Sequence, residues 1–215
     1  MRAATMRARI MADRVATFAE GVHAPGATPI DPDDAHGLIP SSVNTLSELN
    51  AFEQANVLSA TEWALRPSRR VQPMRVLTTD FLIALHRRMF DQTWRWAGQL
   101  RRTDKNIGVH WPTIRVALRD QLENAHFWLA HEVYSADEIA ARLHHAIVVV
   151  HPFPNGNGRW SRLAADTLLH GQRRPLFSWG AADLSRAGNA RTAYLHALRE
   201  ADCGDFGALL NFVRS

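Results

Sequence analysis

The segment from Ala146 to Arg162 limits the folds open to this chain more than any other part of the sequence. An apolar run, Ala146–Val150, leads directly into His151, and a tight turn containing prolines and glycines follows. Glycine lets the backbone bend so that successive amide groups point at one spot, and a helix N-terminus adds unpaired N–H donors. The pattern predicts two central helices joined by a turn that can bind a polyphosphate, with a histidine base beside it.

Two arginines strengthen the prediction of a phosphate site. Arg159 and Arg162 are three residues apart, so they lie on one face of the helix that follows the turn and project toward that turn. Trp160 and Leu163 face the other way, into the core. A structural turn with surface arginines does not require a histidine at the end of a buried helix, so a nucleotide or phosphate site is favoured.

Helical spacing of apolar residues recurs along the rest of the chain. Thr45 with Glu48, and Ser135 with Glu138, have the form of capping boxes, and Thr78 opens a further cap cluster. Pro112 suits the first turn of a helix, and Gly171 suits a C-cap. Helices are predicted over about 46–64, 79–90, 112–129, 136–150, from the motif arginines to residue 171, 191–200 and 206–213.

The segment between residues 92 and 111 differs from its helical surroundings. It contains Trp94, Trp96 and Trp111, two glycines and the turn-like residues 103–106. Its composition predicts a short β-hairpin, 99–102 against 107–110, with the tryptophans in the core. The predicted fold class is therefore mainly α, a single-domain helical bundle with one β-hairpin.

Three parts of the chain are distinguished by sequence. Residues 1–40 form an N-terminal arm followed by an extended loop rich in Pro, Asp, Gly and Ala, without the apolar region of a secretory signal. Residues 41–74 supply an N-terminal helix packed on the core, and residues 75–215 form the core domain.

The composition of the chain bears on its expected cellular location and on the classes of partner it could bind. The single cysteine, Cys203, excludes an internal disulfide and fits a cytoplasmic location, and no apolar run reaches the length of a membrane span. Basic residues are dispersed among acids and only Lys105 is a lysine, so neither a membrane nor a nucleic acid is an expected partner. The oligomeric state is left open.

The motif resembles the signature of the Fic family, HxFx(D/E)GNGRxxR. His151, Phe153, the run Asn155–Arg159 and Arg162 carry this resemblance. The N-terminal segments Pro25–Pro29 and Glu53–Asn56 are similar to a bacterial subgroup labelled mobile mystery protein B. Further similarity is carried by Trp96-Ala97-Gly98, Arg101, Tyr194-Leu195, Ala197-Leu198 and Gly204-Asp205-Phe206.

The resemblance implies a Fic-type bundle that transfers AMP from ATP to a Ser, Thr or Tyr hydroxyl of a target protein. It assigns His151 as the general base and the backbone amides of Gly156–Gly158 as an anion hole. It also implies that Asn157 contacts phosphate and that Arg159 and Arg162 hold the β- and γ-phosphates. Phe153 is expected to be buried as the anchor of the turn.

One residue departs from the family pattern. Asn155 stands where the family has Asp or Glu to hold Mg²⁺, and an amide oxygen brings no negative charge to a hard cation. The pyrophosphate could hold the metal, with Asn155 as a weak ligand. Two alternatives stay open: transfer of another phosphate-containing group by the same turn, and a weakly active nucleotide-binding regulator in a toxin–antitoxin-like pair, with an antitoxin or regulatory partner.

The resemblance also suggests an inhibitory glutamate. Many Fic proteins carry a helix whose glutamate pairs with the second motif arginine, and Glu53 is the candidate here, with Arg162 as its expected partner. A carboxylate on that arginine would compete with phosphate for the same guanidinium. A solvated helix glutamate is the alternative for Glu53, and Glu62 is a weaker candidate.

The predicted hairpin corresponds to the family's flap over the active site. Its edge is expected to add a strand to an extended segment of the target. The residues assigned to this docking role are Thr103, Asp104, Lys105, Asn106, Ile107, Gly108 and Val109.

Three histidines near the motif, His144, His145 and His151, have a spacing that predicts a poor metal chelate. His144 and His151 are two helical turns apart, about 10 Å by helix rise, which is too far for a single Zn²⁺. His144 and His145 are expected to form a packed or hydrogen-bonded pair, and Cys203 is expected to be buried or incidental.

Overall fold

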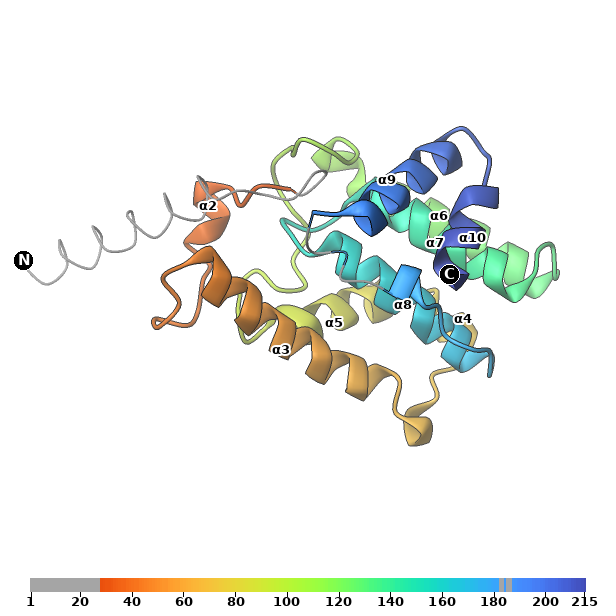
Figure 1. Cartoon of the computed structure of the whole chain (residues 1–215), viewed down its shortest axis with the longest axis horizontal. Helices are drawn as coiled ribbons and strands as arrows, with labels where there is room; N and C mark the ends of the chain where they lie inside the picture. The colour runs from red at the N-terminus through yellow and green to blue at the C-terminus, as the bar shows by residue number, and fades with distance from the viewer. Residues whose placement is uncertain (1–27, 182–183, 185–186) are drawn as a thin grey trace, which may run out of the picture.

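A computed structural model describes residues 28–181, 184 and 187–215, except for the side chain of Arg69, and these residues are mainly helical (Figure 1). The α-helices are α2 (Pro32–Ala35), α3 (Leu46–Ala64), α4 (Pro73–Val76), α5 (Thr79–Phe90), α6 (Ile114–Ala130), α7 (Ala136–Val150), α8 (Asn157–Gly171), α9 (Asn189–Asp202) and α10 (Gly207–Arg214). Three short 3₁₀ turns, η1 (Pro67–Arg69), η2 (Trp111–Thr113) and η3 (Trp179–Ala181), accompany them.

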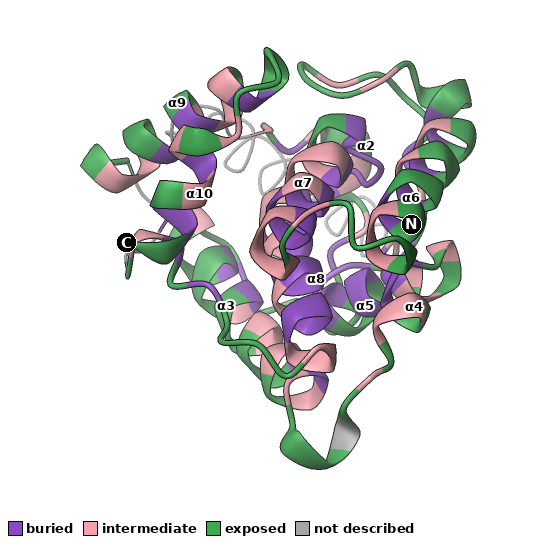
Figure 2. Cartoon of the chain, turned by 90° about the vertical axis from the view of Figure 1, so that its right-hand side faces the viewer, coloured by how far each residue is buried: buried purple, intermediate pink, exposed green. Residues whose placement is uncertain are grey.

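Helices α7 and α8 form the centre of the fold, as predicted, and the motif turn joins them. They pack against each other, α6 covers α7, and α5 contacts α8. Helix α3 lies along α5, while α9 and α10 pack together and α10 reaches α7. Figure 2 shows the buried residues concentrated on α5, α7 and α8. This arrangement places the motif turn between α3, α5 and α9.

The predicted caps explain where three helices begin. The Thr45 hydroxyl accepts from the Glu48 N–H at 3.2 Å, and the Glu48 carboxylate accepts from the Thr45 N–H at 3.0 Å, which completes the capping box of α3. Ser135 accepts from the N–H of Glu138 at 3.2 Å at the start of α7. Thr78 caps α5. Local hydrogen bonding thus sets these boundaries, and the helices predicted from it are confirmed.

The side chains of the motif helix divide as predicted. Trp160 is fully buried, and its indole N–H donates to the carbonyl of Leu82 at 2.8 Å, which fixes α8 on α5. Leu163 is also buried. Gly171 ends α8 as its last residue, whereas the cap is Gln172, one residue beyond the predicted position.

The predicted β-hairpin over 99–110 is wrong. Among the described residues the one β-bridge pairs Leu38 with Trp94, outside the predicted strands. The backbone N–H of Arg101 donates to Pro152 O at 2.9 Å, and the Asp104 carboxylate accepts from the N–H of Trp111 at 2.8 Å. Because these groups bond to the motif turn and to side chains, no ladder forms and the segment is a loop.

The tryptophans of this segment are predicted to lie in the core, but their burial differs from one to the next. Trp94 is 1% exposed, Trp96 is half-buried and stacks on Trp94, and Trp111 is 41% exposed. The prediction is therefore wrong for Trp111, which lies at the exposed turn before α6.

The segment preceding α3 is predicted to be an extended loop, and within it α2 forms a single short helix. Asp31 caps α2 by accepting from the N–H of Asp33 at 3.0 Å. The arm predicted for the first residues falls mostly outside the described part of the chain. The division into 1–40, 41–74 and 75–215 stays a prediction. Across the described ranges, each helix is too short or too polar to cross a bilayer.

Candidate active site

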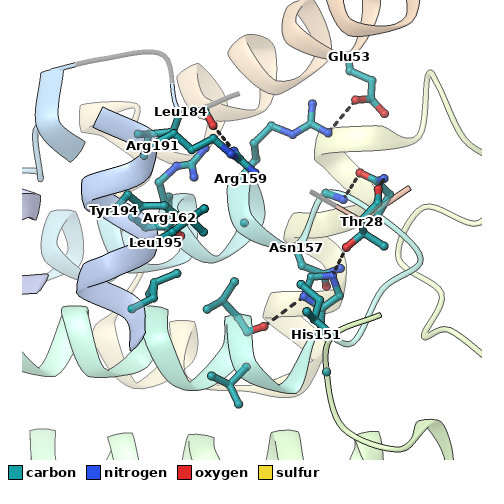
Figure 3. A pocket seen from close by; sticks show the side chains of 18 of the residues that line it. Thr28, Glu53, His151, Asn157, Arg159, Arg162, Leu184, Arg191, Tyr194 and Leu195 are labelled. Carbon is teal, nitrogen blue, oxygen red and sulfur yellow. Dashed lines mark hydrogen bonds and ion pairs between the residues drawn. The ribbon is translucent and has the colours of Figure 1, made fainter. Parts of the chain in front are cut away.

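The motif turn opens onto a cleft of about 510 Å³ (Figure 3). Its walls come from the turn, α3, α9, the end of α7, residues 28–30 and the loop near Gly108. Every residue of 155–159 lines it, together with His151, Arg162 and Glu53. The fold therefore brings to one cleft the predicted base, the predicted phosphate-binding residues and the predicted inhibitory glutamate.

His151 is the C-cap residue that follows α7; it has the left-handed conformation, with φ 51°, and is 5% exposed. Its Nδ1 lies 3.2 Å from the carbonyl oxygen of Val148. A carbonyl can only accept, so Nδ1 carries the hydrogen and Nε2 carries the free lone pair. Burial lowers the pKa of His151 to about 4, the Val148 hydrogen bond opposes this, and the charge of Arg101 lowers it further. His151 is therefore neutral at pH 7 and can accept a proton at Nε2.

The lone pair of His151 already has a partner that was not identified from the sequence. Thr28 Oγ1 lies 2.9 Å from His151 Nε2, and the Thr28 carbonyl accepts from the amide of Asn155 at 3.2 Å. Figure 3 shows Thr28 directly beside His151. The visible sign in the sequence is that Thr28 precedes Pro29, which favours an extended backbone but names no partner.

The shape of the turn depends on Gly156 and Asn157. Gly156 has φ 80°, and a Cβ there would lie 2.5 Å from the ring of Phe90. The buried Asn157 side chain was expected to contact phosphate. It instead accepts from the Phe153 N–H at 2.9 Å and donates to the Phe153 carbonyl at 2.8 Å. Asn157 therefore closes the turn, and its backbone N–H is what it can offer a phosphate.

A second histidine supports the turn from behind. The N–H of Gly98 donates to His86 Nδ1 at 3.0 Å, so Nε2 carries the hydrogen and donates to the carbonyl of Asn155 at 3.1 Å. His86 stacks on Phe153, with centroids 3.6 Å apart, and Phe153 is fully buried as predicted. Complete burial lowers the pKa of His86 to about 3. No sequence motif marked this histidine.

The two motif arginines have different surroundings. Arg159 donates to the Glu53 carboxylate at 2.7 Å, and the other Glu53 oxygen accepts from the Trp94 indole at 2.6 Å. The expectation that Glu53 pairs with Arg162 is therefore wrong, because α3 passes beside the first arginine. Glu53 is 5% exposed, so the solvated alternative is also wrong. Arg162 lies over the ring of Tyr194, 5.9 Å from its centroid.

Arg101 and Gly108 hold the loop against the base. The Arg101 guanidinium is buried and donates to the carbonyls of His151 (2.7 Å), Thr103 (2.9 Å) and Val109. A Cβ on Gly108, where φ is 106°, would lie 2.6 Å from the Cβ of His151. The loop approaches His151 that closely because residue 108 has no side chain.

The residues at the turn do not fit a metal held by the protein. The Asn155 amide oxygen accepts from the Gly156 N–H at 2.6 Å, and its NH₂ is bonded to Thr28. The described residues contain no group of three or more His, Cys, Asp or Glu side chains placed to hold an ion. Asn155 thus brings no charge to a cation, and both ends of its amide are already hydrogen-bonded within the protein, so the geometry adds no support to the predicted role of Asn155 toward Mg²⁺.

His144 and His145 do not pair with each other, contrary to expectation. His144 Nε2 lies 3.0 Å from the Tyr194 hydroxyl in the core, and His145 Nε2 lies 2.8 Å from Asp202 at the cleft. Adjacent residues on α7 point in different directions, so each finds its own partner on α9. Cys203 is exposed.

Part of the cleft wall is apolar. Val148 and Val149 from α7 and Leu195 and Leu198 from α9 line it, as do the paired His145 and Asp202. Arg159, Arg162 and Arg191 line the cleft as well. A cleft that combines cationic groups with an apolar wall and a few polar groups suits an anionic ligand that carries a ring system.

Comparisons with known proteins agree with this geometry. Residues 76–169 match the model of the Fic/DOC family. The chain is similar to proteins named protein adenylyltransferase Fic, from several organisms. The one from Nematostella vectensis is 29% identical over 150 residues, which is 68% of this chain and 34% of that protein. The one from Drosophila grimshawi is 31% identical over 147 residues, 66% of this chain and 29% of that protein. The chain thus spans about a third of the length of these relatives.

Solved structures share the fold. The N-terminal Fic domain of a Bartonella quintana effector aligns with a TM-score of 0.61 at 17% identity, covering 80% of this chain and 84% of that domain. The BepC effector of Bartonella tribocorum, solved with bound AMPPNP, aligns with a TM-score of 0.59 at 18% identity, covering 80% and 87%. Membership of the mobile mystery protein B subgroup stays a prediction. The chain therefore contains a domain of the Fic/DOC family over residues 76–169.

Proposed function

We propose that this protein transfers AMP from ATP to a Ser, Thr or Tyr hydroxyl of a target protein. The observation that carries the proposal is the state of His151, a neutral imidazole whose unprotonated Nε2 faces a hydroxyl inside the cleft. The names of the similar proteins and the AMPPNP in a structural neighbour support the reaction class and the nucleotide. The target protein, an antitoxin or regulatory partner, and a cytoplasmic location remain expectations of the same proposal.

In this mechanism His151 acts as the general base. Nε2 takes the hydroxyl proton of the acceptor while the oxygen attacks the α-phosphorus, and pyrophosphate leaves. A positioned base of this kind contributes about 10²–10⁴-fold to the rate. The hydrogen bond from Nδ1 to Val148 holds the ring in the tautomer that the step requires. The Arg101 bond to the His151 carbonyl fixes the backbone that carries the ring.

The start of α8 is suited to the phosphates. Helix α8 begins at Asn157, and no side chain caps it, so the first N–H groups of the helix are available to an anion. Arg159 and Arg162 rise from the same turn of the helix and add positive charge. Donors preorganised toward developing charge are each worth about 10²–10³ in rate. The apolar wall of α7 and α9 would take the base of the nucleotide.

Mg²⁺ has a limited place in the proposal. Since the turn supplies no carboxylate and the Asn155 amide is bonded within the protein, a cation would depend on the phosphates of ATP for its charged ligands. The steps assigned above to His151, α8 and the arginines do not depend on a cation held by the protein.

The position of α3 bears on activity. Glu53 occupies Arg159, a group that the proposal assigns to phosphate, and its partner Trp94 holds it there from the core side. A carboxylate and a phosphate compete for the same guanidinium, so the described state is one of low nucleotide affinity. This supports the proposed inhibitory role of Glu53, exercised through Arg159.

Two differently labelled nucleotides test the reaction. The protein, as wild type and as Glu53→Gln, is incubated with a lysate and either α-labelled or γ-labelled ATP. AMP transfer predicts protein bands from the α-label alone. Bands from the γ-label that require the added protein, and are absent from the lysate alone, would indicate phosphoryl transfer and overturn the proposal. Tight ATP binding with no band from either label, even in Glu53→Gln, would favour a nucleotide-binding regulator. The observations that favour this alternative are the hydrogen bonds of the Asn155 amide within the protein and the ion pair of Arg159 with Glu53.

A further inference from the structure

The hydroxyl that faces the base belongs to the chain itself. Thr28 Oγ1 lies 2.9 Å from His151 Nε2, within the distance at which a general base takes a proton. Since Nδ1 is the protonated nitrogen, Nε2 accepts, and Thr28 donates its hydroxyl hydrogen to it. This is the relationship that the proposed reaction requires between base and acceptor. Thr28 also lines the cleft together with the motif turn.

Several contacts hold Thr28 in this place independently of His151. Its carbonyl accepts from the Asn155 amide at 3.2 Å, so the backbone of Thr28 is tied to the turn. Ile30, two residues on, is 8% exposed and belongs to the hydrophobic core. Pro29 restricts Thr28 to an extended backbone, the conformation in which a side chain stands out from the chain toward a partner.

Helix α2 anchors the segment to the loop that covers His151. Lys105 Nζ lies 2.6 Å from Asp34 and 3.4 Å from Asp31, and the lysine side chain is 5% exposed. The indole of Trp96 donates to the Asp34 carbonyl at 3.0 Å. The lysine side of this ion pair is buried, whereas the side chains of Asp34 and Asp31 are 21% and 38% exposed, so the contact ties α2 to the loop at the edge of the packed region. Residues 28–34 therefore reach the base as a docked segment with defined neighbours on both sides.

We propose that Thr28 is an acceptor hydroxyl, and that the protein transfers AMP to Thr28 of its own chain. The proposal rests on the proposed AMP transfer and names one substrate of that site. The Thr28 oxygen forms a bond to the α-phosphorus of ATP, and His151 Nε2 takes the hydroxyl proton. The bond from the α-phosphorus to the bridging oxygen breaks, and pyrophosphate carries away the electron pair. The product is a phosphodiester on Thr28.

The same geometry makes self-modification and modification of a partner compete. A hydroxyl from another protein reaches Nε2 only when Thr28 has left it, because one lone pair accepts one hydrogen bond. Removing the Thr28 hydroxyl while keeping its shape should therefore abolish self-labelling and leave Nε2 free for other acceptors. Thr28→Val has this effect, and Thr28→Ser keeps the hydroxyl. Ser41, an exposed hydroxyl beyond α2, provides the matched control as Ser41→Ala.

The experiment uses the full chain in the Glu53→Gln background, where Gln keeps an oxygen for the Trp94 indole and removes the charge from Arg159. The protein is incubated with ATP, and mass spectrometry measures the fraction carrying one AMP and locates it by peptide fragmentation. We expect AMP on Thr28 in the parent and in Ser41→Ala, and at the same position of the chain in Thr28→Ser. In Thr28→Val, label falls by more than about tenfold because the nucleophile is gone. The rate constant should be independent of protein concentration, because the acceptor is in the same chain.

A parallel tube containing lysate and α-labelled ATP separates the two proposals. Labelled lysate proteins with an unmodified Thr28 would overturn the self-modification and leave the proposed function standing. If Thr28→Val then labelled lysate proteins more strongly than the parent, Thr28 would be a residue that blocks the base from other acceptors. A rate constant that rises with protein concentration, or undiminished self-labelling in Thr28→Val, would also overturn it. No label on any protein would contradict the AMP transfer itself and the self-modification with it.

Discussion

Arg159 on the motif helix and Glu53 on α3 form an ion pair, 2.7 Å between Nη2 and Oε2, whose side chains are 22% and 6% exposed. The pair joins two segments that are far apart in the sequence across the mouth of the cleft. Because the Trp94 indole holds the other carboxylate oxygen, Glu53 is fixed in place rather than free to follow Arg159. The position of α3 thus determines whether the first motif arginine is available to a phosphate.

Glu53→Gln should increase affinity for a nonhydrolysable ATP analogue. The substitution frees the Arg159 guanidinium from its carboxylate, and we expect Kd to fall by about tenfold, or about 1.4 kcal/mol. Isothermal titration calorimetry measures the change. Glu62→Gln, at an exposed position on the same helix, is the control and should leave Kd unchanged. Equal affinities for wild type and Glu53→Gln would show that this ion pair does not obstruct the nucleotide.

Arg101→Ala should destabilise the fold strongly. The buried guanidinium donates to the carbonyls of His151, Thr103 and Val109, and its removal leaves these acceptors without their charged partner. We expect a loss of about 3 kcal/mol in the free energy of unfolding, measured with denaturant. Arg102→Ala, at the exposed neighbouring position, should change it by less than about 0.5 kcal/mol. A similar small change for both variants would refute the structural role of Arg101.

Gly108→Ala tests the close approach of the loop to the base. Gly108 and Gly204 both have positive φ, 106° and 91°, but an added Cβ clashes only at residue 108, where His151 Cβ is 2.6 Å away. Alanine at either site carries backbone strain of about 1–2 kcal/mol. Gly108→Ala should cost about 1–3 kcal/mol more because of the overlap. Equal losses in unfolding free energy for the two variants would contradict the described packing.

Stability should fall in mild acid. His86 and His151 have folded pKa values of about 3 and 4 because of burial, and the pKa of the buried His144 is lowered too, below the unfolded value of 6.5. Below pH 6.5 these histidines bind protons in the unfolded chain but stay neutral in the folded chain. Each one therefore lowers the free energy of unfolding by up to about 1.4 kcal/mol per pH unit. Asp166, whose pKa burial raises to about 6, acts in the opposite direction as pH falls from 6 toward 3.8.

The variant His86→Gln checks this assignment. Removing one buried histidine should reduce the slope of unfolding free energy against pH between pH 6.5 and 4 by about 1 kcal/mol per pH unit. Denaturant titrations at several pH values give the slope. His126→Gln, at an exposed position of α6, serves as the control. An unchanged slope in His86→Gln would mean that His86 is not held neutral in the folded state.

The helices were predictable because their boundaries are set locally. Thr45 and Glu48 reach each other within one turn of α3, and the apolar face of α7 is visible as a spacing of residues. The prediction of a hairpin failed because the backbone N–H and the Nε of Arg101 bond to the carbonyls of Pro152 and His151, about fifty positions away. A composition typical of a turn does not reveal whether its N–H groups pair across a hairpin or with another segment.

The residues of the candidate site likewise separate into those that local sequence predicts and those that depend on tertiary contacts. The motif places His151, Arg159 and Arg162 together because they share one turn and one helix. Thr28 lies at the base because the Asn155 amide, the buried Ile30 and the contact between α2 and Lys105 hold its segment there, and no local pattern encodes these contacts. The pairing of Glu53 with Arg159 rather than Arg162 depends on where α3 crosses α8, which sequence spacing cannot specify.

The central claim, that His151 is the base of an AMP transfer, is tested most directly by one rate comparison. The rate of α-label transfer from ATP to protein is measured for Glu53→Gln and for Glu53→Gln combined with His151→Ala, with nucleotide affinity measured in parallel. We expect His151→Ala to lower the rate by about 10²–10⁴-fold, because base catalysis is lost, while the affinity for a nonhydrolysable ATP analogue stays the same. Transfer at an undiminished rate without the imidazole would contradict the account.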